Sequence, residues 1–166
     1  MRTHCQTIDT RWGRDNHPHY SHGNILPYTG VPFGMNYFLP QTTHEQGAWF
    51  FNPNLPIFQG FRLTHQPSPW IGDYAWCLIT PITGEVASSD LFRRQSSYSM
   101  KEAVFQPHYL RIFSERYQIQ SELVPSRYGA IMHFRAPEKL TLCFHAAKEL
   151  EDLTLTGQTC HFHILD

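Results

Sequence analysis

The sequence is poor in cysteine and in charge, and it contains no long apolar run. Its four cysteines are far apart, and Cys77 and Cys143 lie within apolar, strand-like stretches, whereas Cys5 and Cys160 lie near the ends of the chain. Disulfide-rich domains carry dense, closely spaced cysteines, so this spacing favours reduced thiols. Nowhere do enough apolar residues follow one another to predict a membrane-spanning helix.

Charged residues make up only 16% of the chain, and the formal net charge is -1. The basic residues are scattered, so the sequence lacks the positive patch with which proteins bind nucleic acid or an anionic membrane surface. We expect neither partner. The first residues also lack the apolar centre of a signal peptide, so the chain as given is expected to be cytoplasmic. A signal upstream of the given start would instead make the protein secreted or periplasmic.

Helical periodicity is absent from nearly the whole chain, and a period of two residues takes its place. Apolar and polar side chains alternate over residues 117–123, 128–135 and 140–144, as expected of strands with one buried face. Residues 153–155 and 160–165 have the same character and flank a turn at Gly157, which predicts a hairpin.

The first half of the chain has weaker strand signals. Residues 33–39 alternate, and the apolar run 75–80 has the length of a strand that ends at Pro81. Only residues 99–103 or 146–152 could hold a short helical turn. These patterns predict an all-β fold, an antiparallel two-sheet β-sandwich in which each sheet buries one face against the other.

The length and composition predict one domain. The chain has 166 residues, 41% of them hydrophobic and 14% aromatic, which is ample for a packed core. Residues 1–32 have little periodicity, so we expect an irregular segment that packs on the sandwich. The last residues read like the middle of a strand series, which indicates that the domain spanning residues 1–166 is truncated at its C-terminal end.

Residues 60–76, GFRLTHQPSPWIGDYAW, combine the features of a ligand site. The prolines at positions 67 and 69 fix φ and favour extended backbone before them, so the loop is expected to be stiff. An aromatic face beside imidazole, amide and carboxylate groups suits a polyhydroxylated ligand such as a sugar. The candidate substrate-binding residues in this loop are Trp70, His65, Gln66 and Asp73. The alternative is that Trp70 and His65 pack beneath the loop as core residues.

The same loop resembles the GF-x-x-TH-x-x-S-x-x-x-GDY segment of the N-terminal domain of glycoside hydrolase family 92, the calcium-dependent α-mannosidases. Residues 23–27 and 31–35 resemble the family's GN-x-x-P and PFGM elements, and residues 81–85 resemble its P-x-TGE element. The motifs agree in order and spacing from about residue 9 to about residue 134. One departure is Trp76, which stands where many members carry an acidic residue.

The resemblance implies a sandwich that contacts substrate and docks onto a larger C-terminal helical catalytic domain, which these residues do not include. It also implies that the catalytic acid and base belong to that helical domain, together with most of the calcium ligands. Asn24, like Asn16, lies in the irregular segment and could line the substrate pocket or lend the ion one oxygen. Without the helical domain, exposed aromatic residues and an unpaired edge near residues 160–165 are expected to favour self-association.

The residues themselves also place catalysis elsewhere. Glycoside hydrolysis usually needs a carboxylic acid and a carboxylate that face each other, and no such pair is evident in the sequence. Asp73 lies in the matched loop, but an Asp after a glycine often caps a turn, so binding or loop support ranks above catalysis. The close pairs His161/His163 and His17/His19 lack an obvious third metal ligand. We therefore assign no catalytic and no metal-binding residue to this segment.

The leading hypothesis is the N-terminal, substrate-contacting domain of an exo-acting, inverting α-mannosidase that uses calcium when complete and binds a mannoside or oligosaccharide. The segment alone is expected to be inactive. The alternative is a free-standing carbohydrate-binding or interaction module without hydrolytic activity. A histidine-based metal enzyme would be favoured only by stoichiometric zinc or iron.

Overall fold

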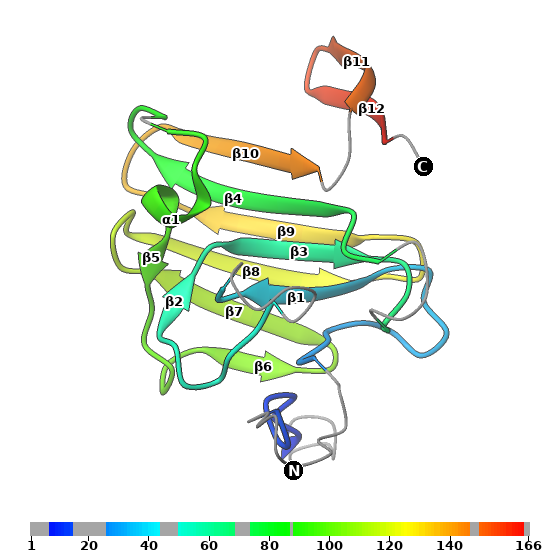
Figure 1. Ribbon diagram of the computed structural model, residues 1–166, viewed down its shortest axis with the longest axis vertical. Coiled ribbons are helices and arrows are strands. Elements are labelled where there is room, and N and C mark those ends of the chain that lie inside the picture. Colours follow the sequence, from blue (N-terminus) through cyan, green and yellow to red (C-terminus); the bar gives the residue numbers. More distant parts are fainter. Residues whose placement is uncertain are drawn as a thin grey trace.

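Two four-stranded antiparallel sheets form the body of the computed structural model (Figure 1). The first sheet has the strand order β1-β3-β4-β10, and the second has the order β6-β7-β8-β9. The structure describes residues 7–14, 26–43, 50–68, 74–86, 88–146 and 150–164. The prediction of an all-β, antiparallel two-sheet sandwich is confirmed.

The strand bounds largely follow the alternation in the sequence. The first sheet contains β1 (Tyr37–Gln41), β3 (Gly60–Thr64), β4 (Cys77–Thr83) and β10 (Leu140–Ala146). The second sheet contains β6 (Val104–Gln106), β7 (Tyr109–Ser114), β8 (Ile119–Pro125) and β9 (Ala130–Arg135). The other elements are β2 (Ile57–Phe58), which pairs with β5 (Ser96–Ser97), the short helix α1 (Leu91–Arg94), and the predicted hairpin, β11 (Leu150–Thr156) with β12 (Thr159–Ile164). No helix among these elements is long and apolar enough to cross a membrane.

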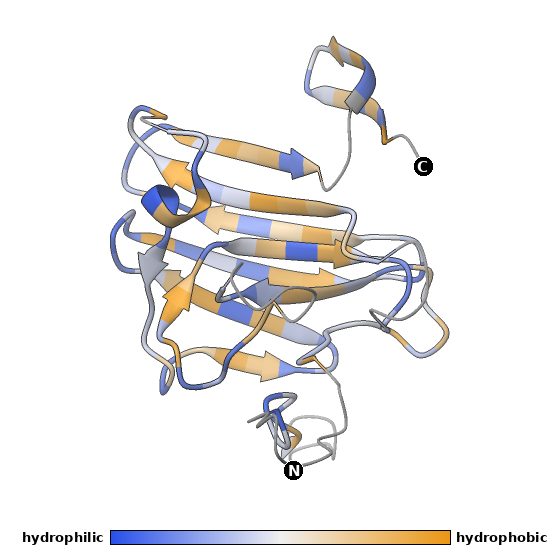
Figure 2. Ribbon diagram, in the orientation of Figure 1, coloured by the Kyte–Doolittle hydropathy of each residue, from blue (hydrophilic) through white to orange (hydrophobic). Residues whose placement is uncertain are grey.

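The core lies between the two sheets. Alternate residues of β7 are buried, with Leu110 and Ile112 fully enclosed, because successive side chains of a strand point to opposite faces. Figure 2 shows this alternation as orange bands interrupted by white or blue ones along the strands. Phe61 of β3 and Phe134 of β9 join the sheets through a ring contact with centroids 6.5 Å apart. The inward-facing aromatic and aliphatic side chains therefore hold the sandwich together.

The two central strands of the first sheet approach closely at Gly60. Its φ is 143°, a conformation that favours glycine, and a Cβ built at this position would lie 2.5 Å from the carbonyl oxygen of Ile79 on β4. A side chain here would push β3 and β4 apart. Glycine is therefore required where the strand that leads into the candidate loop begins.

Two strand predictions were wrong at their ends. Alternation over residues 33–39 placed the first strand too early, because Phe33 lies in a turn with φ 58° that a hydrogen bond from Gly34 N to Val31 O closes at 3.0 Å. β4 continues through Pro81 to Thr83. The pairing of β4 with β3 ends at Ile79, whereas its pairing with β10 continues past Pro81. No residue of β3 therefore lies opposite Pro81 that would need a hydrogen bond from its missing N–H group.

The helical predictions were also imprecise. The one helix among the described residues is α1, whose N-terminus is capped by the Asp90 carboxylate at 2.9 Å from Phe92 N. Residues 99–103 form a single turn, as predicted, in which the N–H groups of Glu102 and Ala103 both donate to Ser99 O and the second of these bonds has the spacing of an α-helical turn. The prediction of a helical turn over residues 146–152 was wrong for the part that the structure describes, because Ala146 ends β10 and residues 150–152 belong to β11.

Three of the four cysteines lie in the described residues, and all three are free thiols. Cys77 is buried in β4, and burial raises the pKa of its thiol to about 11, although the charge of Arg62 opposes this rise. Cys143 is half-buried and Cys160 is exposed. A buried thiol with a raised pKa is a poor nucleophile, so Cys77 is a packing residue.

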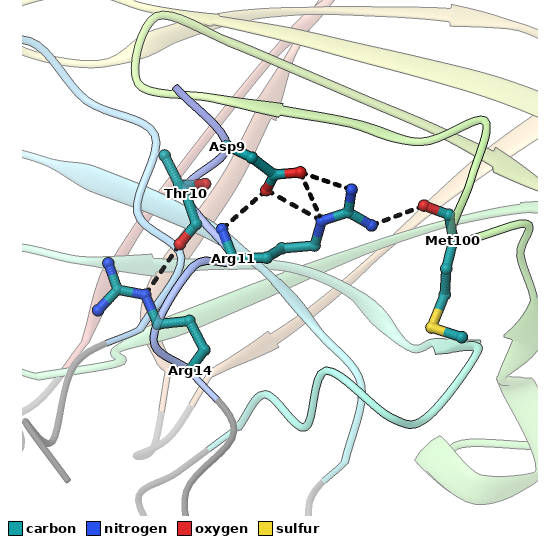
Figure 3. Close-up of polar contacts among 5 residues, drawn as sticks. All are labelled: Asp9, Thr10, Arg11, Arg14 and Met100. Carbon is teal, nitrogen blue, oxygen red and sulfur yellow. Dashed lines mark hydrogen bonds and ion pairs between the residues drawn. The ribbon is translucent and has the colours of Figure 1, made fainter. Parts of the chain in front are cut away.

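The described part of the N-terminal segment is tied to the second sheet. Thr10 N donates to Phe105 O of β6 at 3.0 Å, and Arg11 Nη1 donates to Met100 O at 2.6 Å. The Arg11 guanidinium also lies over the Phe105 ring and pairs with the Asp9 carboxylate at 2.6 Å (Figure 3). These contacts fix an otherwise irregular segment on β6 without a strand of its own.

Asp9 is expected to stabilise the fold at neutral pH and to lose this effect in acid. Burial raises the pKa of the Asp9 carboxyl, but hydrogen bonds from Arg11 and its charge outweigh burial, so the pKa lies below the ordinary value of 3.8. A carboxyl whose folded pKa is depressed contributes stability above its unfolded pKa and loses it as the pH falls through the folded pKa. Asp9→Asn should lower the free energy of unfolding by about 1 kcal/mol at neutral pH.

The measurement is denaturant unfolding of both proteins from neutral pH into strong acid. The difference between them should shrink as the carboxyl of the unmodified protein becomes protonated. Glu151→Gln, which changes an exposed carboxylate on β11, is the matched control and should have little effect at any pH. A difference that stays constant across the series would show that Asp9 acts through packing alone.

The chain is expected to self-associate, because the outer edge of β10 pairs with no strand in the part of the chain that the structure describes. Leu142 and Phe144 on this strand are 38% and 43% exposed, so the edge is also apolar. Light scattering over a concentration series should detect dimers or larger species. Phe144→Lys should shift the population toward monomer, and a clean monomer of the unmodified chain at every concentration would contradict the argument.

Candidate functional site

The loop between β3 and β4 lies at one end of the sandwich, the right-hand end in Figure 1. Of the residues predicted to bind substrate, His65 and Gln66 lie among those that the structure describes. Trp70, Asp73 and Asn24 lie outside the described residues, so their roles stay predictions. The described part of the site therefore consists of the two ends of the loop, where it leaves β3 and where it enters β4.

His65 is held on two sides. Its Nδ1 lies 2.9 Å from Met35 O, and its ring stacks on Trp76 with centroids 5.2 Å apart and an interplanar angle of 12°. A carbonyl oxygen only accepts, so Nδ1 carries the proton of this hydrogen bond, and Nε2 of the neutral ring is an acceptor. The half-buried imidazole can therefore present one defined polar atom to a ligand hydroxyl.

The hydroxyl of Thr64 connects the two ends of the loop. It donates to Gln66 O at 2.5 Å and accepts from Ala75 N at 3.0 Å. Ala75 has a φ of 55°, a left-handed conformation that costs free energy in a residue other than glycine. One buried oxygen thus fixes both where the loop begins and where it returns. The main chain of Gln66 takes part in this closure, while its side chain is half-buried.

Beneath the loop, Arg62 is a buried guanidinium whose environment contains no carboxylate partner among the described residues. Its Nε and Nη2 donate to Gln41 Oε1 at 2.9 and 2.5 Å, and Nη1 donates to Ala75 O at 3.1 Å. The Phe50 ring lies 4.4 Å from its Cζ. Burial lowers the pKa of Arg62 to about 10, while Cys77 and Tyr74 act in the opposite direction. The hydrogen bonds and the aromatic face reduce the cost of burying this cation.

A tyrosine from the N-terminal segment holds the first part of the loop. Tyr28 OH donates to Pro67 O at 2.8 Å. Tyr28 also packs edge to face against Tyr37, and Tyr74 stacks on Phe50 with centroids 6.1 Å apart. Burial raises the pKa of Tyr74 to about 12, so its phenol stays protonated at neutral pH. The loop is therefore clamped by side chains from three separate segments.

Two further turns meet at the same end. Met35 N donates to Arg127 O, and Asn36 Nδ2 donates to Tyr128 O, both at 2.7 Å, so residues 31–36 lie against the turn between β8 and β9. Phe33 and Tyr128 are 92% and 71% exposed. The site end of the sandwich therefore carries exposed aromatic side chains beyond the predicted loop.

An apolar groove of about 480 Å³ opens between the sheets beside these turns. Trp76 lines it together with Leu63, Met132, Phe134 and Tyr128. The indole Nε1 of Trp76 is buried and has no hydrogen-bond partner in the described structure. Trp76 thus faces the groove while it stacks on His65, so the position that departs from the family's acidic residue has an aromatic role here.

Sequence reasoning missed the contributions of Trp76, Phe33 and Tyr128. The PFGM element contains Phe33, so that motif was a signal for it. Tyr128 looked like one more apolar residue of an alternating strand. Nothing in its local pattern shows that the turn at residues 126–129 lies against residues 31–36, because that contact joins segments far apart in the sequence.

The family comparison agrees with the motifs. The chain matches the model described as the glycosyl hydrolase family 92 N-terminal domain over residues 7–161. It belongs to that family. The expectation drawn from the loop and its flanking motifs is therefore confirmed. No curated protein matches the sequence significantly.

The similar solved structures are family 92 enzymes. The family GH92 inverting mannosidase BT2199 from Bacteroides thetaiotaomicron VPI-5482 has a TM-score of 0.71 and 28% identity, with 87% of this chain and 20% of that chain covered. The α-mannosidase BT3965 from Bacteroides thetaiotaomicron, in complex with mannoimidazole, has a TM-score of 0.65 and 22% identity, covering 81% of this chain and 19% of that one. This family 92 chain thus spans about a fifth of the length of these relatives.

Catalytic carboxylates are not evident at the site end among the described residues. Glu122, in the middle of β8, accepts hydrogen bonds from Tyr109 OH and, at 3.0 Å, from His133 Nδ1. These hydrogen bonds lower the pKa of Glu122, whereas the general acid of a glycosidase has a raised pKa.

Arg62→Met is expected to lower the free energy of unfolding by about 3 kcal/mol, because it removes charge-assisted hydrogen bonds and leaves Gln41 Oε1 and Ala75 O with fewer donors. The methionine keeps much of the volume, so packing loss is small. Denaturant unfolding measures the effect. Arg135→Met, on the exposed face of β9, is the matched control and should change stability by less than about 0.5 kcal/mol. Equal effects of the two substitutions would show that the Arg62 network contributes nothing specific.

Proposed function

We propose that this chain is the substrate-contacting N-terminal domain of an exo-acting, inverting α-mannosidase. The observation that carries the proposal is the family match over residues 7–161, together with the agreement of the fold with solved family 92 mannosidases. In this proposal the complete protein hydrolyses α-mannosides, and a C-terminal helical domain supplies the catalytic acid and base. This domain binds and orients the sugar.

The geometry of the loop supports a binding role. The Nε2 atom of His65 is fixed in position by the hydrogen bond to Met35 O and the stack on Trp76, so it can accept a hydrogen bond from a sugar hydroxyl without first being ordered. Trp70 and Asp73 follow in the same clamped loop. We assign Trp70 the stacking face for a pyranose ring, and Gln66, Asp73 and Asn24 further polar contacts.

The family's calcium ion is part of the proposal, but it lies mostly outside this segment. Among the described residues, no group of three or more His, Cys, Asp or Glu side chains is placed to hold a metal ion. We assign most of the calcium ligands to the C-terminal helical domain.

Trp70→Ala in the complete protein is expected to lower kcat/KM for an α-mannoside about tenfold, because stacking on a sugar face contributes on the order of 1 kcal/mol or more. His65→Ala should reduce kcat/KM in the same direction, since it removes the fixed acceptor. The assay follows mannose release with calcium present, and nuclear magnetic resonance of the first-formed anomer reports inversion. The 166-residue chain alone should release no mannose.

Thermal unfolding of each variant separates binding from packing. If either substitution lowers the melting temperature and leaves kinetics unchanged, that residue is a core residue beneath the loop. Turnover by the 166-residue chain alone would contradict the placement of catalysis in another domain. Sugar binding without hydrolysis by the complete protein would favour the alternative, a free-standing carbohydrate-binding or interaction module.

A further inference from the structure

A second cavity, of about 600 Å³, lies at the opposite end of the sandwich from the candidate loop. It is found where β4 ends at Thr83, whereas the loop enters β4 at Cys77, about 20 Å away at the rise of a strand. In Figure 1, α1 marks this end, on the left of the view. Its polar lining residues are Arg93, Arg94, Arg116, Tyr117, Glu85 and Glu138.

The arginines of this cavity are held in place by main-chain carbonyl groups. Arg116 Nη1 donates to Arg93 O at 2.5 Å and to Gln95 O at 3.3 Å. Arg94 Nη2 donates to Ser89 O at 3.0 Å, and the Tyr117 hydroxyl donates to Arg94 O at 3.0 Å. The guanidinium groups are thus ordered before any ligand arrives, which reduces the entropic cost of binding.

Their positive charge is balanced only in part, by exposed glutamates that form no ion pair in the described structure. Carbonyl oxygens satisfy N–H groups but carry no net charge, and neither Arg94 nor Arg116 has a carboxylate within ion-pair distance in the described structure. Arg93 alone approaches one, Asp90, at 3.7 Å on the exposed surface. Arg94 is also only 7% exposed, and its Nε has no hydrogen-bond partner within the described residues. A buried guanidinium with spare donors is costly unless an anion pairs with it.

The field of these charges reaches their neighbours. Burial raises the pKa of the Tyr117 hydroxyl, while the positive charges of Arg116 and Arg94 act in the opposite direction. The charges of two arginines therefore act together on Tyr117 at this end.

The cavity also has acceptors at its rim. Glu85 and Glu138 are exposed and form no ion pair in the described structure, although both line the cavity. Their charge disfavours a long polyanion such as nucleic acid, while their oxygens can accept hydrogen bonds from hydroxyl groups. Planar guanidinium groups favour oxoanions, which they bind through paired hydrogen bonds.

From these features we propose that this cavity binds a small oxoanion, a phosphate or sulfate group, carried by a hydroxylated small molecule such as a sugar. The arginines hold the oxoanion, and the two glutamates orient the hydroxyl groups. The cavity is separated in space from the candidate loop.

Calorimetric titration of the full 166-residue chain tests this, with inorganic phosphate, inorganic sulfate, a hexose 6-phosphate and the unmodified hexose at constant ionic strength. Phosphate and sulfate should bind, and the hexose 6-phosphate should bind about tenfold more tightly because of the added hydroxyl contacts. The unmodified hexose carries no oxoanion, so any heat of binding that it gives should be the same for the unmodified chain and for a variant that lacks one of these arginines. Equal affinity for the sugar phosphate and free phosphate would overturn the carrier part of the proposal.

Arg116→Gln is expected to weaken phosphate binding about tenfold or more, because a charge-assisted pair is lost. Arg135→Gln, which removes an exposed arginine of β9 outside this cavity, is the matched control and should leave affinity unchanged. Glu138→Gln should strengthen binding of free phosphate by removing repulsion and should reduce the advantage of the sugar phosphate. Phosphate binding that is absent, or that Arg116→Gln and Arg135→Gln weaken equally, would overturn the site.

Discussion

The placement of the candidate loop depends on one buried cation. The Arg62 guanidinium lies on β3 and donates to Gln41 of β1 and to the carbonyl of Ala75, where the loop returns, while its face lies against Phe50. The single side chain of Arg62 therefore connects β3 to β1, to the segment that contains Phe50, and to the returning end of the loop. Since its burial is unfavourable by itself, as the lowered pKa indicates, the surrounding donors and acceptors must keep their positions for the cation to be tolerated.

The two ends of the sandwich use charge and aromatic side chains differently. At the loop end, the cation lies beneath the surface, and the aromatic rings of Phe33 and Tyr128 are exposed. At the end marked by α1, the arginines line the cavity itself. Both ends consist of connections between strands, whose backbone geometry is set by the packed sheets, so the same core supports two chemically distinct surfaces.

The sequence predicted β8, β9 and β10 well, whereas the strands before them were predicted less well or, like β6 and β7, not at all. Ile119 and Leu123 alternate with polar residues because β8 has one buried face, and that pattern is local. Pro81 misled because its tolerance depends on β3 ending before it, a fact of strand pairing that no local pattern contains. The same limit applies to the site: His65 was found from its motif, whereas its hydrogen bond to Met35 and its stack on Trp76 join residues distant in sequence. Tertiary contacts of this kind decide which ring nitrogen of a histidine is left to bind a ligand.

The Thr64 hydroxyl has a consequence for how the two ends of the loop respond to substitution. It satisfies the carbonyl of Gln66 and the N–H of Ala75 at once, so the loop is closed at its base by an atom that belongs to the sheet. Loss of this one oxygen would release both ends together, and it would leave a buried N–H and a carbonyl group without their partner.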